Sequence, residues 1–146
     1  MNAQDQCPTT DLICLIVDDE PSIRTYLRAI LQRQRIQSLE ADSAAQALGI
    51  IQRLGGRLDL IVADIRMPGE MDGIDLAYSV RHSFPAVPVI LISGYGDVDA
   101  VKQAAANFQF IQKPFVPETI LMAVNKVVGS VDGTACKVSI AGQGVL

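Results

Sequence analysis

Four short apolar runs in this chain each end at a residue that can carry chemistry. The runs are Leu12 to Val17, Leu58 to Ala63, Val87 to Ile92 and, more weakly, Gln109 to Gln112. They alternate with amphipathic stretches, a pattern that predicts a parallel sheet covered by helices. Ligands of such open sheets bind at the carboxyl ends of the strands. The pattern therefore predicts that the residues following the runs share one site.

The residues at the ends of these runs suit a divalent cation and a phosphoryl group. Three are carboxylates, one is a hydroxyl and one is an ammonium group: Asp18, Asp19, Asp64, Ser93 and Lys113. Clustered carboxylates repel one another, and Mg²⁺, which prefers oxygen ligands, would relieve that repulsion. Asp64 stands alone at the tip of a central strand, so it is the best candidate for a nucleophile that forms an aspartyl phosphate. Asp18 and Asp19 are adjacent in a loop and are better metal ligands.

The rest of the pattern completes five strand–helix units. A moderate second strand is expected at Ile36 to Ala41, and the helices are expected after Pro21, after a Ser43 cap, around residues 74–80, after an Asp97 cap and from Pro117. Right-handed crossovers in a doubly wound sheet give a flavodoxin-like strand order, 2-1-3-4-5. We therefore expect an α/β fold, a flavodoxin-like (βα)5 five-stranded parallel sheet.

Composition limits the class of protein. The 146 residues are enough for one compact domain, and 49% hydrophobic with 19% charged residues is typical of a globular chain. The net charge is −4 and no basic stripe is visible, so we expect no nucleic-acid binding by this chain. The apolar runs hold about six residues, against the roughly 20 that a membrane-spanning helix needs. Together with the absence of a signal-peptide pattern in residues 1–10, this favours a cytoplasmic protein without membrane contact.

The two ends of the chain differ in character from its middle. Residues 129–146 are punctuated by glycines and show no clear periodicity. We expect a flexible C-terminal tail there and a flexible N-terminal extension at residues 1–10. The domain itself is expected to span residues 11–128.

Five short motifs follow one another in the order and spacing of a known family. They are Val17-Asp18-Asp19-Glu20-Pro21, Asp64-Ile65-Arg66-Met67-Pro68, Met71-Asp72-Gly73, Ile92-Ser93-Gly94-Tyr95-Gly96-Asp97 and Lys113-Pro114-Phe115. With these motifs, the chain resembles a receiver domain of the response regulators of two-component signalling. The resemblance covers about residues 11 to 128, and the joint pattern is highly specific.

The resemblance implies a role for each site residue. Asp64 would be the phosphoacceptor, and Mg²⁺ would be held by Asp18 or Asp19, Asp64 and the backbone carbonyl of Arg66. Lys113 would contact the phosphoryl group, while Ser93 and Phe110 match the switch hydroxyl and the switch aromatic. The implied partners are a sensor histidine kinase or a histidine phosphotransfer protein as phosphodonor, and a downstream protein that the sequence does not identify. A homodimer through the last two helices is also considered.

Two departures from the family pattern stand beside the acceptor. Gly69 and Glu70 lengthen the loop before Met71-Asp72-Gly73, a variant that resembles receivers attached to, or partnered with, hybrid kinases. Arg66 and Tyr95 follow the acceptor and the switch hydroxyl by two residues, positions that tune phosphoryl lifetime in the family.

Three classes of function compete for this chain. The first is a phosphoacceptor signalling module, expected to be single-domain without DNA-binding output and to be no enzyme beyond self-catalysed phosphorylation and dephosphorylation. The second is a phosphohydrolase or phosphotransferase that uses an aspartyl phosphate. The common hydrolase pattern needs an acidic residue two positions after the nucleophile, where this chain has Arg66. The third is a phosphate-independent, receiver-like protein-binding module, against which the complete set of site residues argues.

Overall fold

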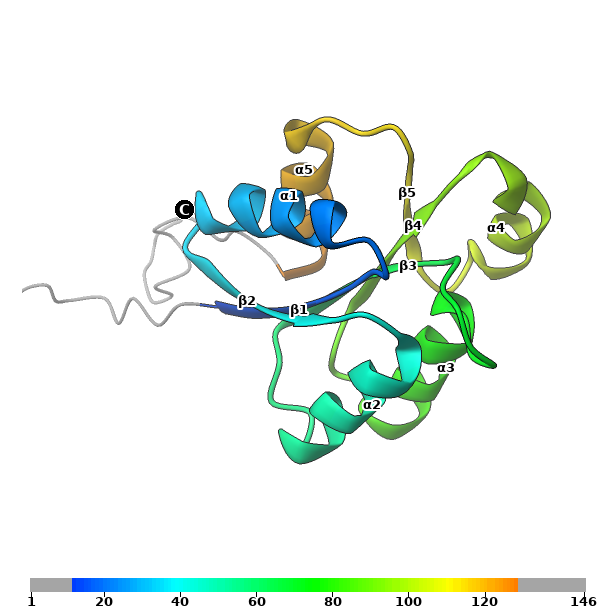
Figure 1. The fold of residues 1–146 in the computed structure, drawn as a ribbon, viewed down its shortest axis with the longest axis horizontal. Helices are drawn as coiled ribbons and strands as arrows, with labels where there is room; N and C mark the ends of the chain where they lie inside the picture. Colours follow the sequence, from blue (N-terminus) through cyan, green and yellow to red (C-terminus); the bar gives the residue numbers. More distant parts are fainter. Residues whose placement is uncertain (1–11, 129–146) are drawn as a thin grey trace, which may run out of the picture.

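The computed structural model describes residues 12–128, in which five parallel strands form one sheet covered by helices on both faces (Figure 1). The predicted extension at residues 1–10 and the predicted tail at residues 129–146 lie outside the described residues. In chain order the elements are β1 (Leu12–Val17), α1 (Pro21–Gln32), β2 (Ile36–Ala41), α2 (Ala44–Arg53), β3 (Leu60–Asp64), α3 (Gly73–Ser83), β4 (Val89–Ser93), the short 3-10 helix η1 (Tyr95–Asp97), α4 (Val98–Ala104), β5 (Gln109–Gln112) and α5 (Pro117–Val128).

The strand order is β2-β1-β3-β4-β5, with every neighbouring pair parallel, which confirms the predicted flavodoxin-like fold. β3 lies at the centre of the sheet. Val17 of β1 pairs with Ala63 of β3, and Asp64 pairs with Ile92 of β4. This register brings the carboxyl ends of the three central strands to the same edge, and the loops that follow them meet there.

Each face of the sheet carries its own hydrophobic core. Alternate residues of the strands, such as Leu15 and Ile61, pack with α2 and α3 on one face, and their neighbours, such as Ile16 and Val62, pack with α1 and α5 on the other. Figure 1 shows these two helical layers on opposite sides of the strands. Because both faces of the central strands are buried, their sequences read as continuous apolar runs rather than as alternating ones. This explains why the runs were visible in the sequence.

The bounds of the two central strands differ from the prediction. The structure places β3 at Leu60–Asp64 and β4 at Val89–Ser93, so both strands begin and end later than the apolar runs. Leu58 and Val87 are buried, but they precede the hydrogen-bonded ladder. The ladder instead includes Asp64 and Ser93, so these two residues belong to the ends of strands rather than to loops. Their backbones are therefore held by the sheet.

One of the two predicted helix caps is wrong. The Ser43 side chain accepts a hydrogen bond from the Gln46 N–H at 3.2 Å, as expected for the N-cap of α2. Asp97 precedes α4 but makes no side-chain cap there. Its carboxylate accepts the Gly94 N–H at 2.7 Å and the Arg66 side chain instead. Val98, the first residue of α4, is 54% exposed although it is apolar.

Within residues 12–128, no helix combines the length and the hydropathy that crossing a membrane requires.

Candidate functional site

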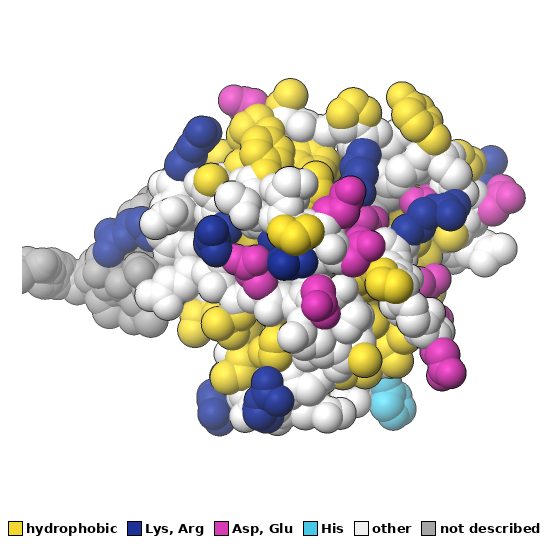
Figure 2. All heavy atoms as spheres, in the orientation of Figure 1, with side chains coloured by type: hydrophobic (Ala, Val, Ile, Leu, Met, Phe, Trp, Pro, Cys, Tyr) yellow, Lys and Arg dark blue, Asp and Glu magenta, His cyan; other side chains and the backbone are white. Residues whose placement is uncertain are grey.

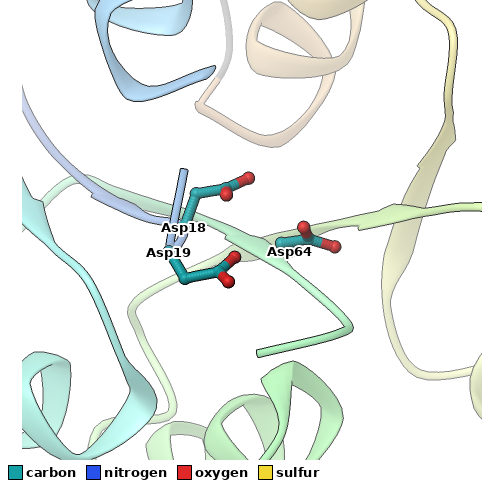
Figure 3. A group of neighbouring side chains, drawn as sticks. All are labelled: Asp18, Asp19 and Asp64. Carbon is teal, nitrogen blue, oxygen red and sulfur yellow. The ribbon is translucent and has the colours of Figure 1, made fainter. Parts of the chain in front are cut away.

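Three carboxylates converge at the carboxyl edge of the sheet. Asp18 and Asp19 come from the loop between β1 and α1, and Asp64 is the last residue of β3 (Figure 3). One carboxylate oxygen of each lies within 4.8 Å of the others. Figure 2 shows acidic side chains gathered on this face of the molecule, with Lys and Arg side chains around them. The structure thus brings together the acidic residues that the sequence placed at the ends of two separate strands.

Asp18 is fully buried, and only one of its two carboxylate oxygens accepts a hydrogen bond from the described residues. Its Oδ1 accepts the Glu20 N–H at 2.8 Å, while no donor among the described residues reaches its Oδ2. Burial, with the charges of Asp64 and Asp19, raises the pKa of the Asp18 carboxyl to about 6, although the Glu20 N–H and Lys113 oppose the rise. A buried carboxylate oxygen without a donor, facing two other carboxylates, is the environment that a hard cation with oxygen ligands would fill. The residues present therefore fit Mg²⁺.

Asp64 is held from two directions. Its Oδ2 accepts a hydrogen bond from Lys113 Nζ at 3.0 Å, and its Oδ1 accepts the Arg66 N–H at 3.2 Å. Burial of the Lys113 ammonium opposes its charge, but the hydrogen bond and the nearby carboxylates outweigh burial and raise the pKa of Lys113. Lys113 is therefore a fixed positive charge beside the only carboxylate of the three that ends a central strand.

Ser93 lies next to this pair but is weakly held. Its side chain is buried, and its hydroxyl donates one long hydrogen bond, 3.5 Å, to the Ile111 carbonyl of β5. The Ser93 carbonyl accepts the Lys113 N–H at 2.8 Å, so the backbones that carry these two side chains are joined. Phe110 of β5 is partly buried against the core on the α2 and α3 face. The switch roles of Ser93 and Phe110 stay predictions.

Arg66 makes a contact that the sequence did not indicate. Its backbone N–H binds Asp64, but its side chain reaches across to the β4–α4 loop, where Nε donates to Asp97 Oδ1 at 2.6 Å and Nη2 donates to the Gly96 carbonyl at 2.9 Å. A Cβ at Gly96 would lie 2.6 Å from this guanidinium, so glycine makes the approach possible. The side chain therefore ties the loop after the acceptor to the loop after Ser93.

Arg24 was also missed as part of the site. The sequence places Arg24 and Arg28 one turn apart on α1, a spacing typical of a solvated face. In the structure both form ion pairs with Glu40 of β2. Arg24 in addition donates a hydrogen bond to the Asp18 carbonyl at 2.6 Å. Only the three-dimensional fold reveals this contact with the acidic loop.

Comparison with known proteins assigns the chain to a family. It belongs to the family described as the response regulator receiver domain, whose model matches residues 14–125. It is therefore a receiver domain of two-component signalling. Domains of this family are signalling phosphoacceptors, generally not enzymes, and they bind Mg²⁺ at an acidic pocket.

The similar proteins are both kinases and regulators. "Sensor kinase CckA" of Brucella abortus is 36% identical over 121 residues, which are 81% of this chain and 13% of that protein. "Response regulator protein PilR" of Pseudomonas aeruginosa is 36% identical over 102 residues, 68% of this chain and 22% of that protein. The chain thus spans about an eighth to a quarter of the length of the curated relatives it matches. The expectation of a single-domain protein without DNA-binding output stays a prediction.

Solved structures agree on the fold. The response regulator receiver domain protein from Clostridium thermocellum aligns with a TM-score of 0.75 and 25% identity, covering 80% of this chain and 94% of that one. NtrX from Brucella abortus aligns with a TM-score of 0.74 and 27% identity, covering 84% of this chain and 28% of that one. This chain is therefore similar both to a separate receiver domain and to one within a longer protein.

Proposed function

We propose that Asp64 accepts a phosphoryl group from the phosphohistidine of a sensor histidine kinase or a histidine phosphotransfer protein, and that the phosphorylated domain then binds a downstream protein. The observation that carries this proposal is the 3.0 Å contact between Lys113 Nζ and Asp64 Oδ2, beside two further carboxylates within 4.8 Å. A nucleophilic carboxylate, a fixed ammonium and a set of oxygen ligands are the groups that phosphoryl transfer needs.

In the proposed transfer, a carboxylate oxygen of Asp64 forms a bond to phosphorus while the phosphorus–nitrogen bond of the phosphohistidine breaks. The electron pair of that bond stays on the imidazole nitrogen of the donor. Lys113 then pairs with a phosphoryl oxygen in place of the carboxylate oxygen that it binds now. Because both carboxylate oxygens of Asp64 are already held, the nucleophile is oriented before the donor arrives.

We propose that four protein groups bind Mg²⁺ beside the acceptor. Asp18, Asp19 and Asp64 offer carboxylate oxygens, and the backbone carbonyl of Arg66 is the fourth proposed protein ligand. Bound there, Mg²⁺ would neutralise negative charge on the phosphoryl oxygens. The buried Oδ2 of Asp18, which has no donor within residues 12–128, supports this assignment.

The switch follows from the added charge. The phosphoryl group on Asp64 carries up to about −2 charge at neutral pH, in place of the single negative charge of the carboxylate. We propose that the Ser93 hydroxyl gives up its long hydrogen bond to Ile111 and turns toward the phosphoryl oxygens. Phe110 then moves into the space that Ser93 leaves, and the surface formed by α4, β5 and α5 changes shape. The phosphoryl group shifts this equilibrium only by its different interaction with the two states.

The test is the intact mass of the protein after incubation with Mg²⁺ and acetyl phosphate, beside an Asp64→Asn control. We expect one added phosphoryl group on the wild type, none on the variant, and none on the wild type in EDTA. An adduct on Asp64→Asn would place the acceptor elsewhere. If the wild type takes no phosphoryl group and shows no Mg²⁺-dependent spectral change with beryllium fluoride, the chain is a phosphate-independent binding module.

A further inference from the structure

Arg24 of α1 contacts the acidic loop through the backbone of Asp18 rather than through a carboxylate. Its side chain is only 17% exposed, although arginine is usually a surface residue. Nη1 donates to the Asp18 carbonyl at 2.6 Å, and Nε donates to Glu40 Oε1 at 2.9 Å. The guanidinium therefore joins the loop after β1 to Glu40, near the end of β2.

This contact fixes the peptide unit between the two adjacent aspartates. The peptide bond is planar, so a hydrogen bond to the Asp18 carbonyl orients the whole plane that links Asp18 to Asp19. Two further hydrogen bonds hold Asp18. Its N–H donates to the Ala41 carbonyl at 3.1 Å, and its Oδ1 accepts the Glu20 N–H. With its backbone and one carboxylate oxygen fixed in this way, Asp18 directs its remaining oxygen, Oδ2, at a defined position.

Glu40 orients the guanidinium. Its Oε1 accepts from Arg24 and its Oε2 accepts from Arg28, so one carboxylate holds both arginines. Removing one member of a largely buried ion pair leaves the other without compensation, so Arg24 depends on Glu40 for its place. Arg28 shares the contact with Glu40 but does not reach the acidic loop, which makes it a matched control. It is 51% exposed and, within residues 12–128, pairs with Glu40 alone.

We infer that Arg24 is a positioning residue of the acidic site: by holding the Asp18 carbonyl it sets the geometry in which Asp18 and Asp19 bind Mg²⁺, and Glu40 holds it in place. This inference rests on the proposed Mg²⁺ site. Groups that orient metal ligands without touching the metal typically change metal affinity 10- to 100-fold when they are removed. We expect the low end of that range, about tenfold, because Ala41 and Glu20 still hold Asp18.

Magnesium affinity, measured by isothermal titration with Mg²⁺ alone, tests the inference. We expect Arg24→Ala to raise the Kd about tenfold and Arg28→Ala to leave it unchanged. Arg24→Lys should fall between the wild type and Arg24→Ala, because an ammonium can reach one acceptor but lacks the fork that binds the carbonyl and Glu40 together. Glu40→Gln should give a smaller loss, since it keeps an acceptor but removes the charge that orients the guanidinium.

A structural role alone would show a different result. In that case Arg24→Ala would lower the stability against urea, yet the folded variant would bind Mg²⁺ with the wild-type Kd, and this outcome overturns the inference. Equal losses for Arg24→Ala and Arg28→Ala would also overturn it, because only Arg24 reaches the loop. If Arg24→Ala does not fold, Arg24→Lys and Glu40→Gln carry the comparison.

Failure of the proposed site gives a separate signature. A wild-type protein that binds no Mg²⁺ overturns the proposed function and this inference with it. If the wild type binds Mg²⁺ and every variant binds it with the same Kd, only the role of Arg24 is overturned.

Discussion

Asp18→Asn should make the metal-free protein more stable at pH 7, although it removes a residue of the functional site. Burial and neighbouring carboxylates raise the pKa of Asp18 from 3.8 to about 6. One pKa unit corresponds to about 1.4 kcal/mol, so keeping this carboxyl ionised at pH 7 costs the fold at most about 3 kcal/mol. Asparagine keeps the shape but accepts a weaker hydrogen bond from Glu20. We therefore expect a net gain of about 1–2 kcal/mol in the free energy of unfolding.

The pH dependence has a defined sign. The pKa of Asp18 is higher in the folded state than in the unfolded state, so between about pH 4 and pH 6 the folded state binds more protons. The contribution of Asp18 to stability therefore falls as the pH rises through this window and is constant above it. Asp18→Asn lacks this contribution, and its advantage over the wild type should grow from pH 4 to pH 7.

Urea unfolding followed by circular dichroism measures both effects. It would be run at pH 4.5 and pH 7.5, in EDTA and in Mg²⁺, with Asp99→Asn as the control because the side chain of Asp99 is exposed and lies outside the acidic cluster. Mg²⁺ should stabilise the wild type but not Asp18→Asn, since only a protein that binds the ion gains from it. An Asp18→Asn variant that is less stable than the wild type at pH 7.5 in EDTA would refute the reasoning.

Three further predictions concern the scaffold of the site. A Cβ at Gly73 would lie 2.1 Å from the Asp64 carbonyl oxygen. Gly73→Ala should therefore lower the free energy of unfolding by about 2 kcal/mol or more in a urea titration. A variant as stable as the wild type would contradict the close packing of Gly73 against the end of β3. Arg66→Ala should speed amide hydrogen exchange of the loop that carries Asp97. The free energy of opening that loop should fall by only about 1 kcal/mol, because the Arg66 side chain is largely exposed. Unchanged exchange in that loop would argue against the ion pair. Leu91→Ala should lower the free energy of unfolding, measured by calorimetry, by about 2–5 kcal/mol because the Leu91 side chain is fully buried. A smaller decrease would mean that the core closes around the gap.

The sequence predicted the central strands of the sheet well because the fold buries them on both faces. The bounds of β1, β2 and β5 are those expected, and β3 and β4 differ only at their ends. A strand covered on both faces has no room for polar side chains, so its apolar run is unmistakable. The same property located the site, since the first polar residue after such a run stands where the strand leaves the core.

The ion pairs around the site could not be predicted in this way. Arg24 and Glu40 are 16 residues apart, and Arg66 and Asp97 are 31 residues apart. Each is a charged residue in a polar stretch, which the sequence alone describes equally well as solvent-exposed. Their pairing depends on how the loops meet at the edge of the sheet, which is decided by packing far from these residues. The predicted cap at Asp97 failed for this reason, because a nearby guanidinium competes for the same carboxylate.

The most direct measurement of the central claim is to locate the phosphoryl group on the chain. Reduction of an acyl phosphate with borohydride converts the phosphorylated aspartate into homoserine, which peptide mass spectrometry can place. After incubation with acetyl phosphate and Mg²⁺, we predict homoserine at position 64 and none in the unphosphorylated control. Homoserine at Asp18 or Asp19, or a phosphoryl adduct that leaves Asp64 unchanged, would contradict the account.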